Sequence, residues 1–298
     1  MYYMKTLLIT GASGFLGWNI CRQARSDWTI WGTFNSHPVK IPGAVLYKID
    51  LTKFNDLKKL FKEAKPDAVI HTAARTDPNY CQENRDASHR VNTKAAIDIA
   101  GLCSDLDIPC LFTSSDLVFN GRNAPYSEQD QPSPLNLYGE HKLMAEIGMK
   151  NRCASVVVCR MPLMFGRSGP AASSFLQPLL KQMKSGIEVN LFVDEFRTPL
   201  SEKNATEGLM IALEKLPDLV HFGGLERFSR YEFGKLVMEV FNFPNAKLNP
   251  CRQQEIQMAA PRPRDVSLTN AKAIQMGFQP DAIKESLERL KGVVDQKL

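Results

Sequence analysis

Tyr138 and Lys142 are the pair of side chains in this sequence that best suits proton transfer. They lie four residues apart in Leu137-Tyr138-Gly139-Glu140-His141-Lys142, so on a helix they share one face. A lysine ammonium beside a phenol favours the phenolate, and we expect it to lower the tyrosine pKa from its usual value of about 10. Such a tyrosine could donate or accept a proton near neutrality.

A serine hydroxyl precedes this pair at the end of an apolar stretch. Thr113-Ser114-Ser115-Asp116 follows Cys110-Leu111-Phe112, which is typical of a buried strand. Ligands of open parallel sheets bind beyond the carboxyl ends of the strands. We therefore expect this stretch, Asp116 included, to reach the same site as Tyr138 and Lys142, where one of its serine hydroxyls could hold a substrate carbonyl oxygen beside the tyrosine.

The first apolar stretch leads into a glycine-rich turn. Leu7-Leu8-Ile9-Thr10 is followed by Gly11-Ala12-Ser13-Gly14-Phe15-Leu16-Gly17. Gly11 can make a tight turn, Gly14 lets the backbone approach a pyrophosphate, and Gly17 lets the following helix pack closely on the strand. Helix N-termini also favour phosphate. The turn therefore predicts a dinucleotide held along Gly11, Ser13, Gly14, Phe15, Leu16 and Gly17.

The end of the second strand bears on the type of cofactor. NAD sites commonly carry an acid about 20 residues beyond the glycines, bonded to the ribose 2'-hydroxyl. This chain has no Asp or Glu between Trp28 and Ile49, and Asn35, Ser36 and Lys40 could hydrogen-bond a 2'-phosphate. These residues favour NADP(H), with NAD(H) left open. Asp50 and Leu51, after the third strand, are better placed to contact the adenine.

Alternating strands and helices must position these groups. Apolar strand patterns fall at 5–10, 29–34, 45–49, 68–72, 110–114 and 155–160, and helical patterns at 16–25, 54–64, 87–103 and 135–150. This alternation predicts an α/β fold with a doubly wound parallel sheet, a Rossmann domain, over residues 1–160. Beyond residue 160 the pattern is irregular, which predicts a smaller C-terminal α+β substrate-binding lobe over 161–298. Segments around 188–222 are expected to return to the first domain.

Composition limits the classes of function. Of 298 residues, 44% are hydrophobic and 23% charged, as in ordinary globular proteins, and the net charge of +5 is scattered rather than gathered into a nucleic-acid-binding block. No apolar run could span a bilayer, so we expect a cytoplasmic protein without membrane association. The seven cysteines are expected to be reduced and buried, and no residues show metal-ligand spacing. His71 is expected to pack internally and His141 to lie on the surface. A homodimer is left open.

Together these motifs resemble extended short-chain dehydrogenase/reductases, and the dTDP-4-dehydrorhamnose reductase branch in particular. The resemblance covers nearly the whole chain. Its motifs are Gly11–Gly17, Ala73-Ala74, Asn92, Ser114–Gly121, Pro134–Gly139, Lys142, Arg160–Gly166, Phe196–Pro199 and Arg262–Val266.

The resemblance implies a role for each matching residue in catalysis. Ser115 would orient the substrate, Tyr138 would act as general acid/base, and Lys142 would support Tyr138 and contact a ribose. Asn92 would support a proton relay, although an asparagine there could instead tie a neighbouring segment to the backbone.

The same resemblance implies binding roles. Ala73, Ala74 and Arg75 would pass along the cofactor, and Met161 would lie near the nicotinamide. Leu163 occupies a position where rhamnose-pathway reductases tend to carry tryptophan against the sugar. Arg262 would hold the nucleotide diphosphate, although it could also be an ordinary loop charge.

Three functions follow from the resemblance. The leading one is NADPH-dependent reduction of a 4-keto group on a nucleotide-activated deoxysugar. The second is a cofactor-binding regulatory subunit, because the regulatory β subunit of methionine adenosyltransferase resembles the same branch. The third is a nucleotide-sugar epimerase or dehydratase, ranked last because a dehydratase would need an acidic pair where Ser115-Asp116-Leu117 offers one carboxylate.

Overall fold

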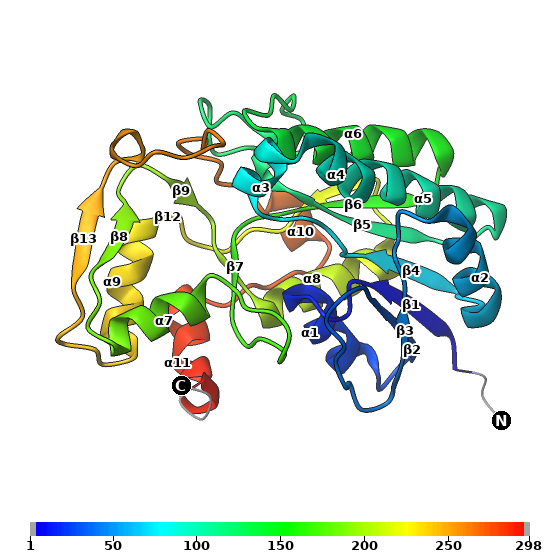
Figure 1. Ribbon diagram of the computed structural model, residues 1–298, viewed down its shortest axis with the longest axis horizontal. Helices are drawn as coiled ribbons and strands as arrows, with labels where there is room; N and C mark the ends of the chain where they lie inside the picture. Colours follow the sequence, from blue (N-terminus) through cyan, green and yellow to red (C-terminus); the bar gives the residue numbers. More distant parts are fainter. Residues whose placement is uncertain (1–3, 295–298) are drawn as a thin grey trace.

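A seven-stranded parallel sheet forms the centre of the computed structural model, which describes residues 4–294 (Figure 1). Its order is β11-β6-β5-β4-β1-β2-β3, and the predicted doubly wound α/β class is confirmed. The strands are β1 (Thr6–Thr10), β2 (Thr29–Phe34), β3 (Ala44–Lys48), β4 (Ala68–His71), β5 (Cys110–Ser115), β6 (Val156–Met161) and β11 (Leu219–His221).

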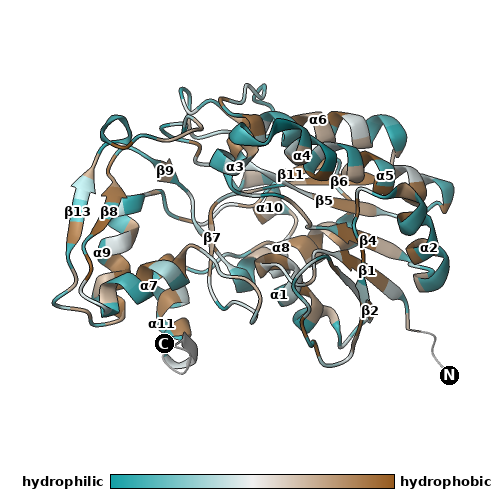
Figure 2. Ribbon diagram, viewed as in Figure 1, coloured by the Kyte–Doolittle hydropathy of each residue, from teal (hydrophilic) through white to brown (hydrophobic). Residues whose placement is uncertain are grey.

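Helices cover both faces of this sheet. One face packs against α1 (Phe15–Ala24) and α8 (Glu202–Lys215), and the other against α2 (Phe54–Ala64), α5 (Ala95–Asp105) and α6 (Leu137–Arg152). Strands β1, β4, β5 and β6 are buried along their whole length, which explains why they are continuously apolar rather than alternating. Hydrophobic colouring is concentrated in this layer in Figure 2.

A smaller lobe lies beside the carboxyl ends of the strands, on the left in Figure 1. It has its own apolar core, which includes α7 (Leu176–Lys184), α9 (Arg230–Val240) and α11 (Ile283–Val294). Short strands complete it: β8 (Val189–Phe192) pairs with β13 (Leu248–Cys251), and β9 (Phe196–Arg197) pairs with β12 (Phe228–Ser229). Another short pair joins β7 (Met164–Phe165) to β10 (Leu200–Ser201).

The stretch 188–222 divides between the two lobes. α8 and β11 belong to the layers of the main sheet, whereas β8 pairs in the smaller lobe. The precise domain boundary at residue 160 stays a prediction.

The helix predicted at 87–103 is interrupted. It consists of α4 (Arg85–His89), a π-helical turn at Arg90–Lys94 and α5. A shorter helix, α3 (Pro78–Glu83), precedes it. No helix among residues 4–294 is long and apolar enough to cross a membrane.

Two histidines and the cysteines can be compared with the sequence predictions. His71 is buried as predicted, but the surface position predicted for His141 is wrong. The ring of His141 is buried against α4, where its Nδ1 lies 2.8 Å from Ser88 Oγ. All seven cysteines are buried and free.

Candidate active site

A cavity of about 810 Å³ opens at the carboxyl ends of the strands, between the glycine turn and the smaller lobe. This volume is typical of sites for cofactors and substrates. Every predicted site residue except Lys40 and Asn92 lines it: Gly11, Ser13, Gly14, Phe15, Leu16, Gly17, Asn35, Ser36, Asp50, Leu51, Ala73, Ala74, Arg75, Ser115, Asp116, Tyr138, Lys142, Met161, Leu163 and Arg262. Residues from distant parts of the chain thus share one cavity.

The glycine turn between β1 and α1 requires glycine at two positions. Gly11 has a φ of +75°, and a Cβ there would lie 2.9 Å from the Cα of Ala73. A Cβ on Gly17 would lie 2.3 Å from the carbonyl oxygen of Gly11. Larger residues would therefore push α1 away from the turn and from the segment after β4. The close packing leaves the N-terminus of α1 facing the cavity, where it suits a phosphate group.

Neutral polar side chains lie at the end of β2. Asn35 and Ser36 line the cavity together with His37, whose Nδ1 is 3.0 Å from Ser36 Oγ. Asp50 lines it beyond β3, and its Oδ1 accepts hydrogen bonds from the backbone and the hydroxyl of Thr52, at 3.0 and 2.7 Å. The Thr52 hydroxyl is the main cause of the lowered pKa of Asp50. Lys40 is not among the described residues that line the cavity.

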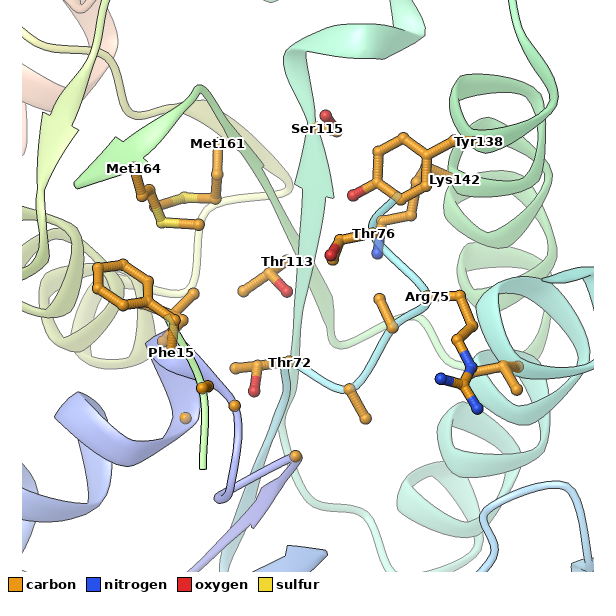
Figure 3. A pocket seen from close by; sticks show the side chains of 18 of the residues that line it. Phe15, Thr72, Arg75, Thr76, Thr113, Ser115, Tyr138, Lys142, Met161 and Met164 are labelled. Carbon is orange, nitrogen blue, oxygen red and sulfur yellow. The ribbon is translucent and has the colours of Figure 1, made fainter. Parts of the chain in front are cut away.

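Ser115, Tyr138 and Lys142 meet on one wall of the cavity. Tyr138 and Lys142 point from α6 toward the strand that carries Thr113 and Ser115, and Met161 lies on the opposite side (Figure 3). Ser115 is the N-cap of a short 3₁₀ turn, Asp116–Val118: its Oγ accepts from Leu117 N and donates to Asp116 Oδ1, both at 3.1 Å. This arrangement could hold a carbonyl oxygen beside a phenol.

Local packing sets the position of the helix that carries the tyrosine. The side chain of Asn136 caps α6 by accepting a hydrogen bond from Gly139 N at 3.0 Å. A Cβ on Gly139 would lie only 2.0 Å from the carbonyl oxygen of Leu117. Because Leu117 follows Ser115 closely in the chain, this contact holds Tyr138 near the serine.

Burial is the main cause of the shifted pKa values of Tyr138 and Lys142. Desolvation raises the pKa of the Tyr138 phenol, the negative charge of Asp116 raises it further, and a hydrogen bond with Ser115 opposes the shift. Burial also lowers the pKa of Lys142 to about 7, which the carboxylate of Glu146 partly opposes. The prediction that the pKa of Tyr138 is lowered beside Lys142 is therefore wrong in this structure, because burial of the phenol dominates and Lys142 is not among the groups that shift it.

Asn92 lies behind the cavity wall, in the π-helical turn. Its Oδ1 accepts from Arg75 N at 2.8 Å and its Nδ2 donates to Arg75 O at 3.0 Å. A third bond joins Nδ2 to Ser88 Oγ at 3.2 Å. Asn92 thus ties the segment after β4 in place, as the alternative interpretation anticipates, and its role in a proton relay stays a prediction.

A chain of buried ion pairs lies at the far end of the cavity and was not predicted. Arg197 Nη1 is 3.0 Å from Asp116 Oδ2, Arg197 Nη2 is 3.3 Å from Glu195 Oε1, and Arg230 Nε is 2.8 Å from the same Glu195 oxygen. Burial opposes ionisation of Glu195, but the charges of Arg230 and Arg197 lower its pKa to about 2. The sequence motif Phe196–Pro199 contains Arg197, but nothing in it indicated that Asp116 would be the partner.

Arg262 reaches the cavity from the C-terminal part of the chain. Its guanidinium is half-buried, and burial lowers its pKa, which the negative charges of Glu195 and Asp77 partly oppose. Leu163 lines the same cavity after β6. The neighbouring Arg264 is not among the described lining residues.

Comparison with known proteins agrees with this architecture. Residues 4–294 match the family described as the RmlD substrate binding domain. The chain belongs to this family. The match spans almost the whole sequence, so the matched residues include both lobes and the residues that line the cavity.

The proteins similar to this chain include beta subunits of methionine adenosyltransferase 2 by name and dTDP-4-dehydrorhamnose reductases by name. Methionine adenosyltransferase 2 subunit beta of Danio rerio is 26% identical over 95% of this chain and 90% of its own length. The crystal structure of a hypothetical dTDP-4-dehydrorhamnose reductase from Sulfolobus tokodaii is 29% identical, with a TM-score of 0.81 over 91% of this chain and 94% of that one. The dTDP-4-dehydrorhamnose reductase of Bacillus anthracis, solved in complex with NADP, is 22% identical, with a TM-score of 0.86 over 97% and 99%.

Proposed function

We propose that this protein is an NADPH-dependent reductase of a 4-keto group on a nucleotide-activated deoxysugar. The observation that carries this proposal is the presence of Ser115, Tyr138 and Lys142 in the same cavity as the glycine turn. The glycines let the chain turn tightly between β1 and α1, so that the N-terminus of α1, at Gly14, Phe15 and Leu16, faces the cavity, and the residues therefore fit the pyrophosphate of a dinucleotide. A bound nicotinamide would supply the hydride.

The residues of the chain then have distinct tasks in the reduction. Ser115 Oγ holds the keto oxygen in position, and Tyr138 donates a proton to that oxygen as it gains charge. The raised pKa of Tyr138 keeps the phenol in the protonated form from which a donor must start. Lys142, with a pKa near 7, can supply the next proton and return the phenolate to its neutral form.

NADP(H) is the proposed cofactor because the end of β2 carries Asn35 and Ser36 and no acid that would repel a 2'-phosphate. The complex of the Bacillus anthracis reductase with NADP supports this choice. Titration of the protein with NADPH and NADH in parallel is expected to give clearly tighter binding of NADPH. Tighter binding of NADH would contradict the proposed preference.

The reaction is tested by following NADPH oxidation with a panel of dTDP-, UDP- and GDP-linked 4-keto deoxysugars. At least one member is expected to be reduced to the 4-hydroxy sugar, with the Tyr138→Phe variant as the inactive control. Absence of turnover with every member, by protein that binds NADPH, would contradict the proposal.

A regulatory role is the second candidate, favoured by the beta-subunit relatives that cover 95% of this chain. The intact Ser115, Tyr138 and Lys142 argue for catalysis, but a protein that only binds a cofactor can also retain such residues. The catalytic and the regulatory role can be distinguished by mixing this protein with the methionine adenosyltransferase catalytic subunit from the same organism. A stable complex without turnover of any keto sugar would favour the regulatory role.

A further inference from the structure

Asn79, on α3, binds the C-terminal segment that carries Arg262 to the edge of the cavity. Its Oδ1 accepts two hydrogen bonds from the C-terminal segment, one from Ala260 N at 3.1 Å and one from Arg262 Nη2 at 3.0 Å. Asn136 Nδ2 donates a third bond to Pro261 O at 3.0 Å. The segment that carries Arg262 is thus held by two asparagines of the larger lobe.

The anchoring bonds leave most of the Arg262 guanidinium free. Its Nη1 donates to Ala260 O at 2.9 Å and its Nη2 to Asn79, so two of its five N–H groups are used and three remain. Two bonds from different nitrogens fix both the direction and the plane of the group. Arg262 lines the cavity in this orientation, whereas Asn79 is not among the described lining residues.

We propose that Asn79 is a positioning residue, which holds the Ala260–Arg262 segment against α3 and directs the free N–H groups of Arg262 toward the diphosphate of the substrate. This inference rests on the proposed function for the identity of the anion. A guanidinium whose plane is fixed loses less rotational freedom on binding phosphate, so its anchor contributes to affinity without touching the ligand. Asn136 is a poor test of the idea, because it also caps the helix that carries Tyr138.

Equilibrium binding of dTDP and UDP to the full-length protein tests the proposal. Asn79→Ala removes both acceptor bonds and is expected to weaken diphosphate binding by about three- to tenfold, the equivalent of a neutral hydrogen bond. Arg262→Ala is expected to weaken it more, by about ten- to a hundredfold. NADPH affinity should be unchanged in both variants. Asn84→Ala is the matched control, since Asn84 ends the same helix and its side-chain amide donates to Tyr80 O, at 3.1 Å, within that helix and not to the Ala260–Arg262 segment.

The double variant separates positioning from general damage. If Asn79 acts through Arg262, adding Asn79→Ala to Arg262→Ala should cause no further loss of nucleotide affinity. The proposal would be overturned if Asn79→Ala weakened nucleotide binding equally in the wild type and in Arg262→Ala. Asn79→Asp keeps both acceptors but adds a negative charge beside Arg262, so it should hold the segment and still weaken diphosphate binding.

Hydrogen exchange at the Ala260 amide provides a test that needs no nucleotide. Asn79→Ala should speed this exchange, while Asn79→Asp and Asn84→Ala should leave it slow. Unchanged protection in Asn79→Ala would overturn the anchoring role. Failure of the wild-type protein to bind dTDP or UDP, with faster exchange in Asn79→Ala, would instead reject the proposed substrate and retain the anchor.

Discussion

At the scale of single residues, the site is controlled by burial of groups that can carry charge. Tyr138 is only 8% exposed and Lys142 only 2%. Lys142 Nζ lies 4.0 Å from the centroid of the Phe112 ring, so its surroundings are largely apolar. Desolvation therefore favours a neutral phenol and a lysine close to half-ionised at neutral pH. The neutral phenol is the form of Tyr138 that can donate a proton.

The first prediction at this scale concerns the proton donor. Tyr138→Phe removes one hydroxyl and preserves the ring, so fold and NADPH affinity should be retained. The reduction rate should fall by about 10² to 10⁴, the usual contribution of a general acid. Steady-state kinetics together with NADPH titration measure both effects. A variant that keeps near wild-type turnover would show that Tyr138 is not the acid.

The second residue-scale prediction links Lys142 to stability. In the unfolded chain a lysine keeps its proton to a pH of about 10.4, whereas in the folded protein Lys142 releases it near 7. Between these values the unfolded state binds more protons, so rising pH stabilises the folded state. Lys142→Met should therefore be more stable than the wild type at pH 7 and below, and the difference should shrink as the pH approaches 10.

Denaturant titrations of the cofactor-free protein at several pH values measure this difference. Lys150→Met, at an ion pair between α6 and Asp218, is a suitable control because Lys150 is 34% exposed. A gap between Lys142→Met and the wild type that does not change with pH would contradict the prediction.

At the scale of elements, the contact between α6 and the 3₁₀ turn after β5 decides whether the catalytic groups meet. Ser115 belongs to the strand, and Tyr138 and Lys142 belong to the helix. Gly139 allows the helix backbone to approach Leu117, and Asn136 fixes where the helix begins. The Tyr138-Gly139 sequence therefore combines the acid with the residue that brings it close to the serine.

Gly139→Ala should damage the site through this contact. Its Cβ would collide with the backbone oxygen of Leu117, which cannot move without shifting the turn, so we expect a loss of about 1–3 kcal/mol in the free energy of unfolding. Turnover should fall as well, because Tyr138 moves away from Ser115. Denaturant unfolding and steady-state kinetics measure the two effects.

Gly148→Ala in the same helix is the matched control. There the new Cβ would meet Cδ1 and Cγ1 of Ile97 but no backbone atom, so only this side chain has to change its rotamer, and alanine favours the helix by about 0.5–1 kcal/mol. Its stability and turnover should stay close to those of the wild type. Equal behaviour of the two variants would show that the contact with Leu117 does not constrain α6.

At the scale of the whole molecule, buried charges join the lobes across the cavity. Asp116 follows the central strand β5, Arg197 and Glu195 lie at β9, and Arg230 begins α9 of the smaller lobe. Arg197 pairs with both carboxylates, and its side chain is 4% exposed. The position of the smaller lobe therefore depends on this arginine as well as on apolar packing.

Arg197→Met should destabilise the protein strongly. It leaves Asp116 without its buried partner and removes one of the partners of Glu195, and breaking a buried pair on one side typically costs about 3–5 kcal/mol. Arg227→Met is the control: Arg227 is 48% exposed and its pair with Asp265 should contribute less than about 1 kcal/mol. Chemical denaturation compares the two. A small loss of unfolding free energy in Arg197→Met, similar to that in Arg227→Met, would show that the chain of ion pairs does not hold the lobes together.

The sequence by itself determined the Rossmann architecture and about half of the residues that line the cavity. Strand and helix periodicity reflects burial on local elements, and the ligand edge of a parallel sheet follows from strand direction alone. For this reason the pattern of residue types was enough to place Gly11, Ser115, Tyr138 and Lys142 at one site, and all four line the cavity.

Only the tertiary structure decided the features that depend on contacts between distant segments. The link from Asp116 to Arg197 joins residues 81 positions apart, and that from Asn79 to Arg262 joins residues 183 positions apart. The raised pKa of Tyr138 is of the same kind, because desolvation depends on everything packed around the phenol and not on the lysine one turn away. Periodicity is a local property of the chain, whereas burial and ion pairing are settled by which surfaces the fold brings together.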